Sequence, residues 1–279
     1  MITPPTPTLP MADPHPSLLL EQTLWDLFWI PPDITVVDRP ELLAMQCPRP
    51  VPYLNMVLRT RAPAHQLPAL VAEVGQLHRH CTSRWVVTDT TDTAPLTAAL
   101  AAGGYEAAER HDVRAVHVDA VASRTTGNWL VRDVDSMARL REEYDVIGQA
   151  FGMGVSFTDE SLAKDLELCT EPAARVHRFL AYDATDRPVA TGALTVYPSL
   201  GFGLLWGGGT IPDARGRGAY AAIMAARVAR ARVLGVSCIG LYARVDTSSP
   251  IVARLGFARW GEMTWWKRLP PADQASSHP

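Results

Sequence analysis

Apolar and polar positions in the second half of the chain follow a regular succession of helical and strand periods. Apolar residues three and four apart predict helices that start at Asp135 or Ser136, at Thr158 or Asp159, and at Ala219. Short apolar runs between turn residues predict strands over 129–131, 178–182, 189–197, 203–211, 238–243 and 260–267. A short helix capped by Ser248 or Ser249 is expected between the last two strands. This succession predicts an α/β domain over residues 129–268.

The first half repeats the end of this order in a weaker form. Strands are predicted over 53–60, 84–87 and 113–118. Helices are predicted over 67–80 and from Thr93 to an end at Gly103-Gly104-Tyr105. A polar stretch over 119–128 contains no large apolar residue and is interpreted as a linker. The pattern therefore predicts a degenerate internal repeat with a first domain at 17–118, and chance similarity of short α/β pieces is the alternative.

Composition narrows the class of protein. The chain has 279 residues, of which 47% are hydrophobic, and a net charge of −3, which does not provide the positive field that nucleic-acid binding needs. Residues 1–16 and 269–279 are poor in core-forming residues and are predicted to be disordered tails. No apolar run reaches bilayer-spanning length and no signal peptide is evident, so we expect a cytoplasmic protein with no membrane partner.

The cysteines and histidines do not form a metal-binding pattern. The four cysteines lie far apart in the sequence, so buried reduced thiols are expected rather than disulfides or metal ligands. His78 and His80 are two residues apart and diverge on a helix, and none of the eight histidines forms a ligand pair. No metal is expected.

The loop from Arg215 to Tyr220 is the strongest candidate for chemistry. Gly216 and Gly218 lie between a strand and a helix, where free backbone N–H groups and the positive end of the helix stabilise phosphate oxygens. Arg215 and Arg217 add charged donors for the same oxygens. A tight strand-to-helix turn is the alternative reading of the glycines. Three further arginines of the helix, Arg227, Arg230 and Arg232, are interpreted as part of its solvent-exposed face.

Two other phosphate-binding patterns fit the same loop poorly. Gly216-x-Gly218-x-x-Ala221 matches the spacing of a dinucleotide fingerprint, but Pro212 and Asp213 separate it from the strand, and the residues around Cys238 are uncharged. A Walker A loop needs Gly-Lys-Ser or Gly-Lys-Thr, which the chain lacks here. A nucleotide-dependent oxidoreductase is therefore the weakest of three functional hypotheses.

The segment from Trp129 to Arg268 resembles the GCN5-related N-acetyltransferase (GNAT) superfamily. Residues 210–220 are similar to its main acetyl-CoA motif, and residues 249–257 are similar to its later helix-to-strand signature, which ends in Gly-Phe. The resemblance implies two GNAT-like α/β domains, each a mixed, mostly antiparallel twisted sheet flanked by helices. It further implies acetyl-CoA as cosubstrate, with pantetheine on the strand before the loop. The cofactor-binding residues would be Gly209, Thr210, Ile211, Arg215, Gly216, Arg217, Gly218, Ala219, Tyr220 and Ser249.

The chain departs from the family pattern at the positions of the acid and base residues that transfer protons. Val252 stands where the family often has a tyrosine that protonates the leaving thiolate, and the strand 203–211 carries no carboxylate to serve as a base. The first domain lacks the glycine loop, so its expected roles are to act as scaffold and as a wall of the acceptor site. Asp246 is the candidate base or anchor for the acceptor ammonium, and Tyr242 is the candidate acid, while a loop aspartate and a packing tyrosine are the alternative readings.

The acceptor is expected to be the primary amine of a small molecule. An apolar acceptor pocket would be lined by Phe151, Met153, Phe157, Trp206 and Trp260, although each of these residues also fits a role in the core. The leading hypothesis is an N-acetyltransferase in which the amine attacks acetyl-CoA directly. A non-catalytic acyl-CoA-binding or regulatory protein is the alternative, and the sequence does not define the oligomeric state.

Overall fold

The computed structural model describes residues 15–122, 127–152 and 158–271. The described residues form one sheet of eleven strands in the order β1-β2-β3-β4-β11-β5-β10-β9-β8-β7-β6. The strands of the first half are β1 (Thr35–Arg39), β2 (Leu42–Gln46), β3 (Met56–Thr60), β4 (Ser83–Thr88) and β5 (Glu106–His117). Those of the second half are β6 (Leu130–Asp133), β7 (Val176–Tyr182), β8 (Pro188–Tyr197), β9 (Phe202–Thr210), β10 (Cys238–Arg244) and β11 (Ala258–Arg268).

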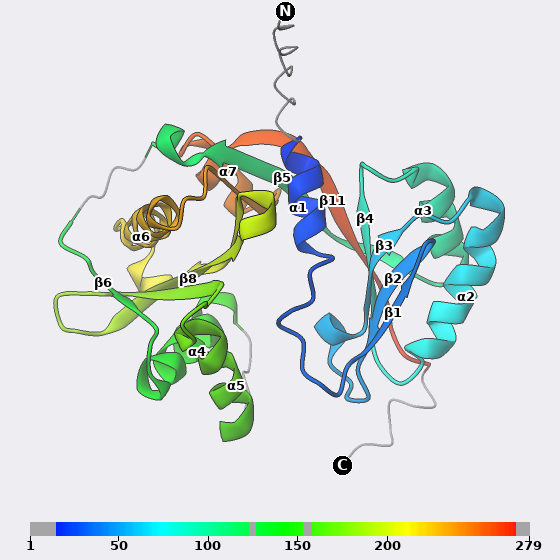
Figure 1. The fold of residues 1–279 in the computed structure, drawn as a ribbon, viewed down its shortest axis with the longest axis horizontal. Coiled ribbons are helices and arrows are strands. Elements are labelled where there is room, and N and C mark those ends of the chain that lie inside the picture. Colours follow the sequence, from blue (N-terminus) through cyan, green and yellow to red (C-terminus); the bar gives the residue numbers. More distant parts are fainter. Residues whose placement is uncertain (1–14, 123–126, 153–157, 272–279) are drawn as a thin grey trace, which may run out of the picture.

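Seven α-helices pack against this sheet in the described part of the chain (Figure 1). They are α1 (Pro16–Thr23), α2 (Leu67–Leu77), α3 (Thr93–Ala102), α4 (Met137–Phe151), α5 (Asp159–Thr170), α6 (Ala219–Val233) and α7 (Ser248–Ala253). Parallel pairing joins β3 to β4 and β9 to β10, and the other neighbouring strands are antiparallel. The predicted mixed, mostly antiparallel sheet flanked by helices is confirmed.

β5 and β11, the last strands of the two halves, each pair with strands of the other half. β5 pairs along its length with β10, from Cys238 opposite His117 to Arg244 opposite His111. β11 pairs on one side with β5 and on the other with β4, from Met263 opposite Thr88 onward. Figure 1 shows β11, in red, running from the second half into the sheet of the first. Each half therefore completes the sheet of the other.

Three clusters of buried side chains form the core. One belongs to the second half and includes Leu140, Leu180 and Ile223, and another belongs to the first half around Trp85. The third fills the junction of the halves, where α1 lies across β5, β9, β10 and β11 and packs Leu20 beside Phe202. The helix α1 and the strands β1 and β2 have no counterpart in the sequence prediction. The four buried residues Leu42 to Met45 give no alternation that would distinguish a strand from a buried helix segment.

Residues with capping contacts mark the ends of helices α4 and α5. The Ser136 hydroxyl accepts from the Arg139 amide at the start of α4, Gly152 ends that helix with φ 66°, and Thr158 forms a capping box at α5. The prediction that Ser248 or Ser249 caps α7 is wrong, because the cap position is Thr247 and both serines lie inside the helix. Residues 52–54 form a 3-10 turn rather than the start of a strand, α2 ends at Leu77, and β5 begins before residue 113. No helix in the described ranges is long and apolar enough to cross a membrane.

Lowering the pH from 7 to 4 is expected to destabilise the first half through His78. This side chain is fully buried between the Ser83 hydroxyl (2.7 Å) and the Met45 carbonyl (2.8 Å), and burial lowers its pKa to about 4. Below pH 6.5 the unfolded chain binds a proton that the folded chain does not, so stability present above pH 6.5 is lost as the pH falls. The loss is about 3 kcal/mol for one group. Urea unfolding between pH 7 and pH 4 measures it.

The substitution His78→Gln is expected to flatten this pH dependence, with His65→Gln, at an exposed position, as the matched control. An unchanged pH slope in the His78→Gln variant would contradict the assignment.

Candidate functional site

β9 and β10 are paired only at one end. Three residues of each strand are in register, from Cys238 opposite Phe202 to Gly240 opposite Leu204, and the pairing stops there. Beyond this point the strands continue to Thr210 and Arg244, so one edge of β9 from Leu205 to Thr210 has no strand partner. An unpaired strand edge offers main-chain N–H and C=O groups to an extended ligand.

A β-bulge lies in the same segment of β9, in its pairing with β8 on the other side of the strand. Thr191 pairs with Gly209 and Ala193 pairs with Trp206, so two residues of β9, Gly207 and Gly208, lie opposite the single residue Gly192. Gly207 has φ 61°, which glycine adopts without strain. The bulge leaves local main-chain groups without ladder partners at the point where the two strands separate.

The glycine loop follows directly from this edge. After β9, Pro212–Ala214 form a 3-10 turn, and Gly216 (φ 75°) and Gly218 (φ 96°) turn the chain into α6. The N-cap residue is Gly218, which has no side chain that could accept hydrogen bonds from the first amides of α6. The first amides of α6 are therefore free to donate to an anion.

The structure places the two loop arginines differently. Arg215 donates to the Thr210 carbonyl (3.1 Å) and to the Ala150 carbonyl at the end of α4 (3.0 Å), so it ties the loop to that helix. Arg217 is exposed and makes no hydrogen bond or ion pair with any residue that the structure describes. Of the two side chains, Arg217 is the one available to a phosphate group.

Solved structures with the same architecture are known, although no protein-family model and no curated protein sequence matches this chain. A GCN5-related N-acetyltransferase from Kribbella flavida has a TM-score of 0.66 at 17% identity, covering 95% of this chain and 99% of its own. A GCN5-related N-acetyltransferase from Sphaerobacter thermophilus has a TM-score of 0.61 at 17% identity, covering 84% and 83%. A tandem GNAT protein from the clavulanic acid biosynthesis pathway has a TM-score of 0.58 at 16% identity, covering 91% and 89%.

This chain has the tandem GNAT fold. The resemblance predicted from the sequence is confirmed at the level of fold, because identities this low establish architecture only. The bulged strand, the diverging pair and the glycine loop lie in the second GNAT unit.

Ser249 lies in the first turn of α7 and faces away from the free edge of β9. Its hydroxyl donates to the Asp112 carboxylate of β5 and accepts from Arg114 Nε (3.0 Å), and the side chain is 2% exposed. β5 lies on the side of β10 opposite to β9. These contacts assign Ser249 to the junction of the two GNAT units, and its predicted contact with cofactor stays a prediction.

The two candidate proton-transfer residues lie in different surroundings. Tyr242 is part of the junction cluster, its hydroxyl is buried without a hydrogen-bond partner, and burial raises its pKa well above the usual value. The phenol therefore stays protonated at neutral pH. Asp246 is exposed after β10 and lies 3.4 Å from Arg244. Val252, where the family often has tyrosine, is fully buried in the core of the second half.

The three predicted acceptor residues that the structure describes, Phe151, Trp206 and Trp260, do not lie together. Phe151 lies close to the Gly209 backbone in the segment of β9 that β10 does not pair with, since a Cβ built on that glycine would lie 3.1 Å from its ring. Trp206 lies on β9 itself, whereas Trp260 lies on β11, three strand spacings or about 14 Å from β9. Trp260 packs on His15, with ring centroids 5.1 Å apart. Met153 and Phe157 lie outside the described residues.

A buried polar cluster beside Trp206 was not predicted from the sequence. Arg178 Nη1 lies 3.2 Å from Glu143 Oε2, and the Thr191 hydroxyl donates to Glu143 Oε1 at 2.9 Å. The guanidinium lies over the Trp206 ring, 5.0 Å from its centroid. Glu143 and Arg178 come from α4 and β7, so only the folded chain brings them together beside the strand that carries the bulge.

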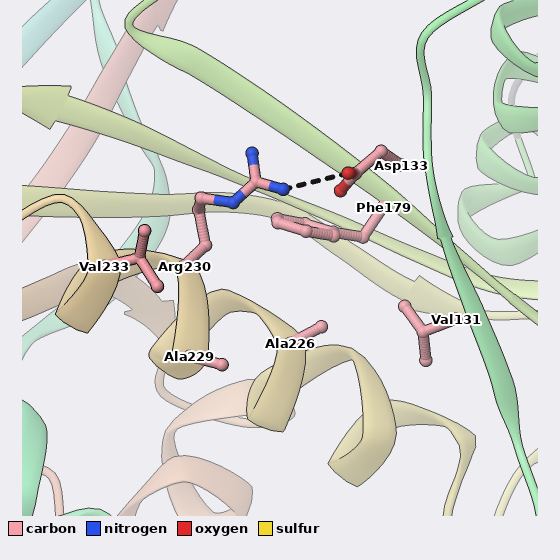
Figure 2. Close-up of a pocket in the computed structure, with 7 residues that line it drawn as sticks. All are labelled: Val131, Asp133, Phe179, Ala226, Ala229, Arg230 and Val233. Carbon is pink, nitrogen blue, oxygen red and sulfur yellow. Dashed lines mark hydrogen bonds and ion pairs between the residues drawn. The ribbon is translucent and has the colours of Figure 1, made fainter.

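Two pockets lie away from the gap in the pairing of β9 and β10. A shallow pocket of about 280 Å³ between α6 and β6–β7 contains the ion pair of Arg230 with Asp133 at 2.8 Å (Figure 2). A second pocket of about 260 Å³ lies in the first GNAT unit, between the ends of β3 and β4 and the start of α2. Within the described ranges, no group of three His, Cys, Asp or Glu side chains could hold a metal ion.

Proposed function

We propose that this protein is an N-acetyltransferase that moves the acetyl group of acetyl-CoA to the primary amine of a small molecule. The observation that carries the proposal is the continuity of three features in the second GNAT unit. The end of β9, which has one unpaired edge and a bulge in its pairing with β8, leads into the Gly216–Gly218 loop, which leads into the uncapped start of α6. Together they offer main-chain donors and acceptors to an extended chain that ends in a pyrophosphate.

Each part of the cofactor has a proposed partner. Pantetheine would pair with the main chain of residues 208–211 in the gap between β9 and β10. The pyrophosphate would accept from the amides between Gly216 and Tyr220 and from the free Arg217 side chain. Gly216 suits this role, because nothing lies within 4 Å of the position where its Cβ would be.

The proposed chemistry is direct acyl transfer. The neutral amine attacks the thioester carbon, the C–S bond breaks, and the amine proton is released as the thiol forms. Main-chain amides at the bulge are the candidate donors to the developing oxyanion. Tyr242, whose hydroxyl is protonated and without a partner, is the candidate acid for the leaving thiolate, and Asp246 is the candidate base or ammonium anchor.

A non-catalytic acyl-CoA-binding protein is the alternative, and one observation favours it. The buried Val252 replaces the tyrosine that serves many family members as an acid. Release of free thiol from acetyl-CoA across a panel of amines distinguishes the two, since a binding protein would hold the cofactor without releasing thiol above the rate without protein.

Reversing the charge of Arg217 is expected to weaken acetyl-CoA binding by about tenfold or more. A hydrogen bond to a charged group contributes about 1.5–3 kcal/mol, and glutamate adds repulsion. Calorimetric titration with acetyl-CoA, CoA, NAD and ATP measures the effect for the wild type and Arg217→Glu. Arg79→Glu, an exposed arginine just beyond α2, is the matched control and should bind as the wild type does. Absence of binding by both CoA species would overturn the proposal.

A further inference from the structure

One arginine of α6 is buried in the core of the second GNAT unit. Arg227 is 1% exposed, so the interpretation of this residue as part of a solvent-exposed face is wrong. It follows Tyr220 by seven residues, which places both on the helix face that packs on β8 and β9. The guanidinium lies 5.6 Å from the centre of the Tyr220 ring.

Two glycines make room for this guanidinium. A Cβ on Gly192 of β8 would lie 3.1 Å from Cζ and Nη1 of Arg227. A Cβ on Gly208 of β9 would lie 3.5 Å from Nη1 and 3.0 Å from the Tyr220 ring. Both glycines belong to the bulge, where Gly207 and Gly208 lie opposite Gly192. The positive charge is therefore seated directly behind the bulge.

Arg227 has no partner for its charge among the described residues. Its Nε and Nη2 atoms are buried and make no hydrogen bond, and no carboxylate lies within ion-pair distance. The neighbouring arginines of the same unit differ. Arg178 pairs with Glu143, and Arg230 pairs with Asp133. A buried guanidinium with nothing but an aromatic ring beside it is unfavourable, unless an anion binds there in the working protein.

The position of the charge along the cleft identifies the part of the ligand that would reach it. Arg227 lies eight residues beyond Ala219, or about 12 Å along the helix from the proposed pyrophosphate site. The side chain spans part of this distance, and its guanidinium ends at Gly192 and Gly208 of the bulge, whereas nothing lies within 4 Å of the Cβ position of Gly216 in the loop. Gly208 begins the segment proposed to pair with pantetheine, so the acyl end of the donor would arrive at the bulge in front of the guanidinium.

We infer that Arg227 binds the terminal carboxylate of an acidic acyl group, so that the cleft takes a dicarboxylic monothioester such as succinyl-CoA more tightly than acetyl-CoA. The inference rests on the proposed function. The planar guanidinium matches a carboxylate through two parallel hydrogen bonds, which a neutral acyl chain cannot form. The transfer itself is unchanged. The amine nitrogen bonds to the thioester carbon, the C–S bond breaks, the proton passes to the thiol, and the product is an amide that keeps the free carboxylate.

The test compares two donors of equal chain length. Succinyl-CoA and butyryl-CoA both carry four-carbon acyl groups, and the first ends in a carboxylate. Calorimetry is expected to show succinyl-CoA binding at least about tenfold more tightly than butyryl-CoA, as two charged hydrogen bonds would give. Arg227→Met should remove this preference, so that succinyl-CoA and butyryl-CoA bind with similar affinity, while Arg230→Met should preserve the preference.

The outcomes separate the two proposals. If acetyl-CoA binds but the wild type holds succinyl-CoA no better than butyryl-CoA, or if Arg227→Met keeps the preference, this inference is overturned and the proposed function stands. If no CoA species binds, both fail. Loss of the succinyl preference in Arg227→Met, with a thermal unfolding transition near that of the wild type, supports the inference. If that variant does not fold, the ratio of the two affinities in the wild type decides alone.

Discussion

A first polypeptide that ends at residue 122 and a second that starts at residue 127 are each expected to be unfolded or aggregated when produced alone. The first would carry β5 without β10 and β11, its two neighbours in the sheet. The second would carry β11 without β4 and β5, and its β10 would lose the partner that covers it from Cys238 to Arg244. Both would expose the junction cluster around Leu20, Phe202 and Met263. Circular dichroism and amide NMR dispersion of each polypeptide measure the result.

Mixing the two polypeptides is expected to restore a folded one-to-one complex, because the exchanged strands pair equally well without a covalent link. The control is the intact chain cleaved at a protease site inserted between residues 122 and 127, which should remain folded. A cooperative unfolding transition in either polypeptide alone would show that the exchange is not required for folding.

The exchange also gives the unit without a glycine loop a structural role. The first unit contributes β5, which lies along the whole of β10, and α1, which lies across β5, β9, β10 and β11. β10 is the strand next to the unpaired edge of β9, so the first unit holds in place the strand that faces this edge. This arrangement agrees with the scaffold role predicted from the sequence, and the role as a wall of the acceptor site stays a prediction.

Local signals in the sequence were sufficient for most of the second unit. Ser136, Gly152 and Thr158 mark helix ends through contacts within a few residues, and Gly216 and Gly218 mark the loop through their own backbone preference. Such signals depend on neighbours in the chain, so the sequence contains them in full. The same reasoning could not place β2, where burial on both faces removes the alternation, or β1, which has no buried residue to mark a core face.

Long-range contacts account for the features that sequence reasoning missed. The Ser249 hydroxyl has its partner 137 residues away, and Arg114 beside it comes from the other unit. Arg227 looked like a surface residue because charged residues on helices usually are, and only the glycines of β8 and β9 make its burial sterically permissible. A signal was present in the spacing, since Arg227 follows Ile223 and Tyr220 on the apolar stripe, where an arginine is unexpected.

Removing the carboxylate of Glu143 is expected to lower the free energy of unfolding by about 3–5 kcal/mol, the usual effect of breaking a buried ion pair. Glu143 is 2% exposed and Arg178 6% exposed, so Glu143→Ala leaves the buried Arg178 guanidinium with only the more distant, partly exposed Asp165 carboxylate at 3.8 Å, and it leaves the Thr191 hydroxyl without its acceptor. Urea denaturation of the intact chain measures the change.

The matched control is Glu160→Ala on α5, whose carboxylate pairs with Lys164 at 3.1 Å on an exposed surface and whose loss should leave stability almost unchanged. The double variant Glu143→Leu with Arg178→Met should recover most of the loss, because it removes both charges together. A cost for Glu143→Ala no larger than that of the control would mean that water reaches the pair. Arg178 covers Trp206 on the bulged strand, so the double variant also tests whether this charge pair is needed for stability or for acetyl-CoA binding. A stable double variant that binds acetyl-CoA as the wild type does would assign the pair to stability alone.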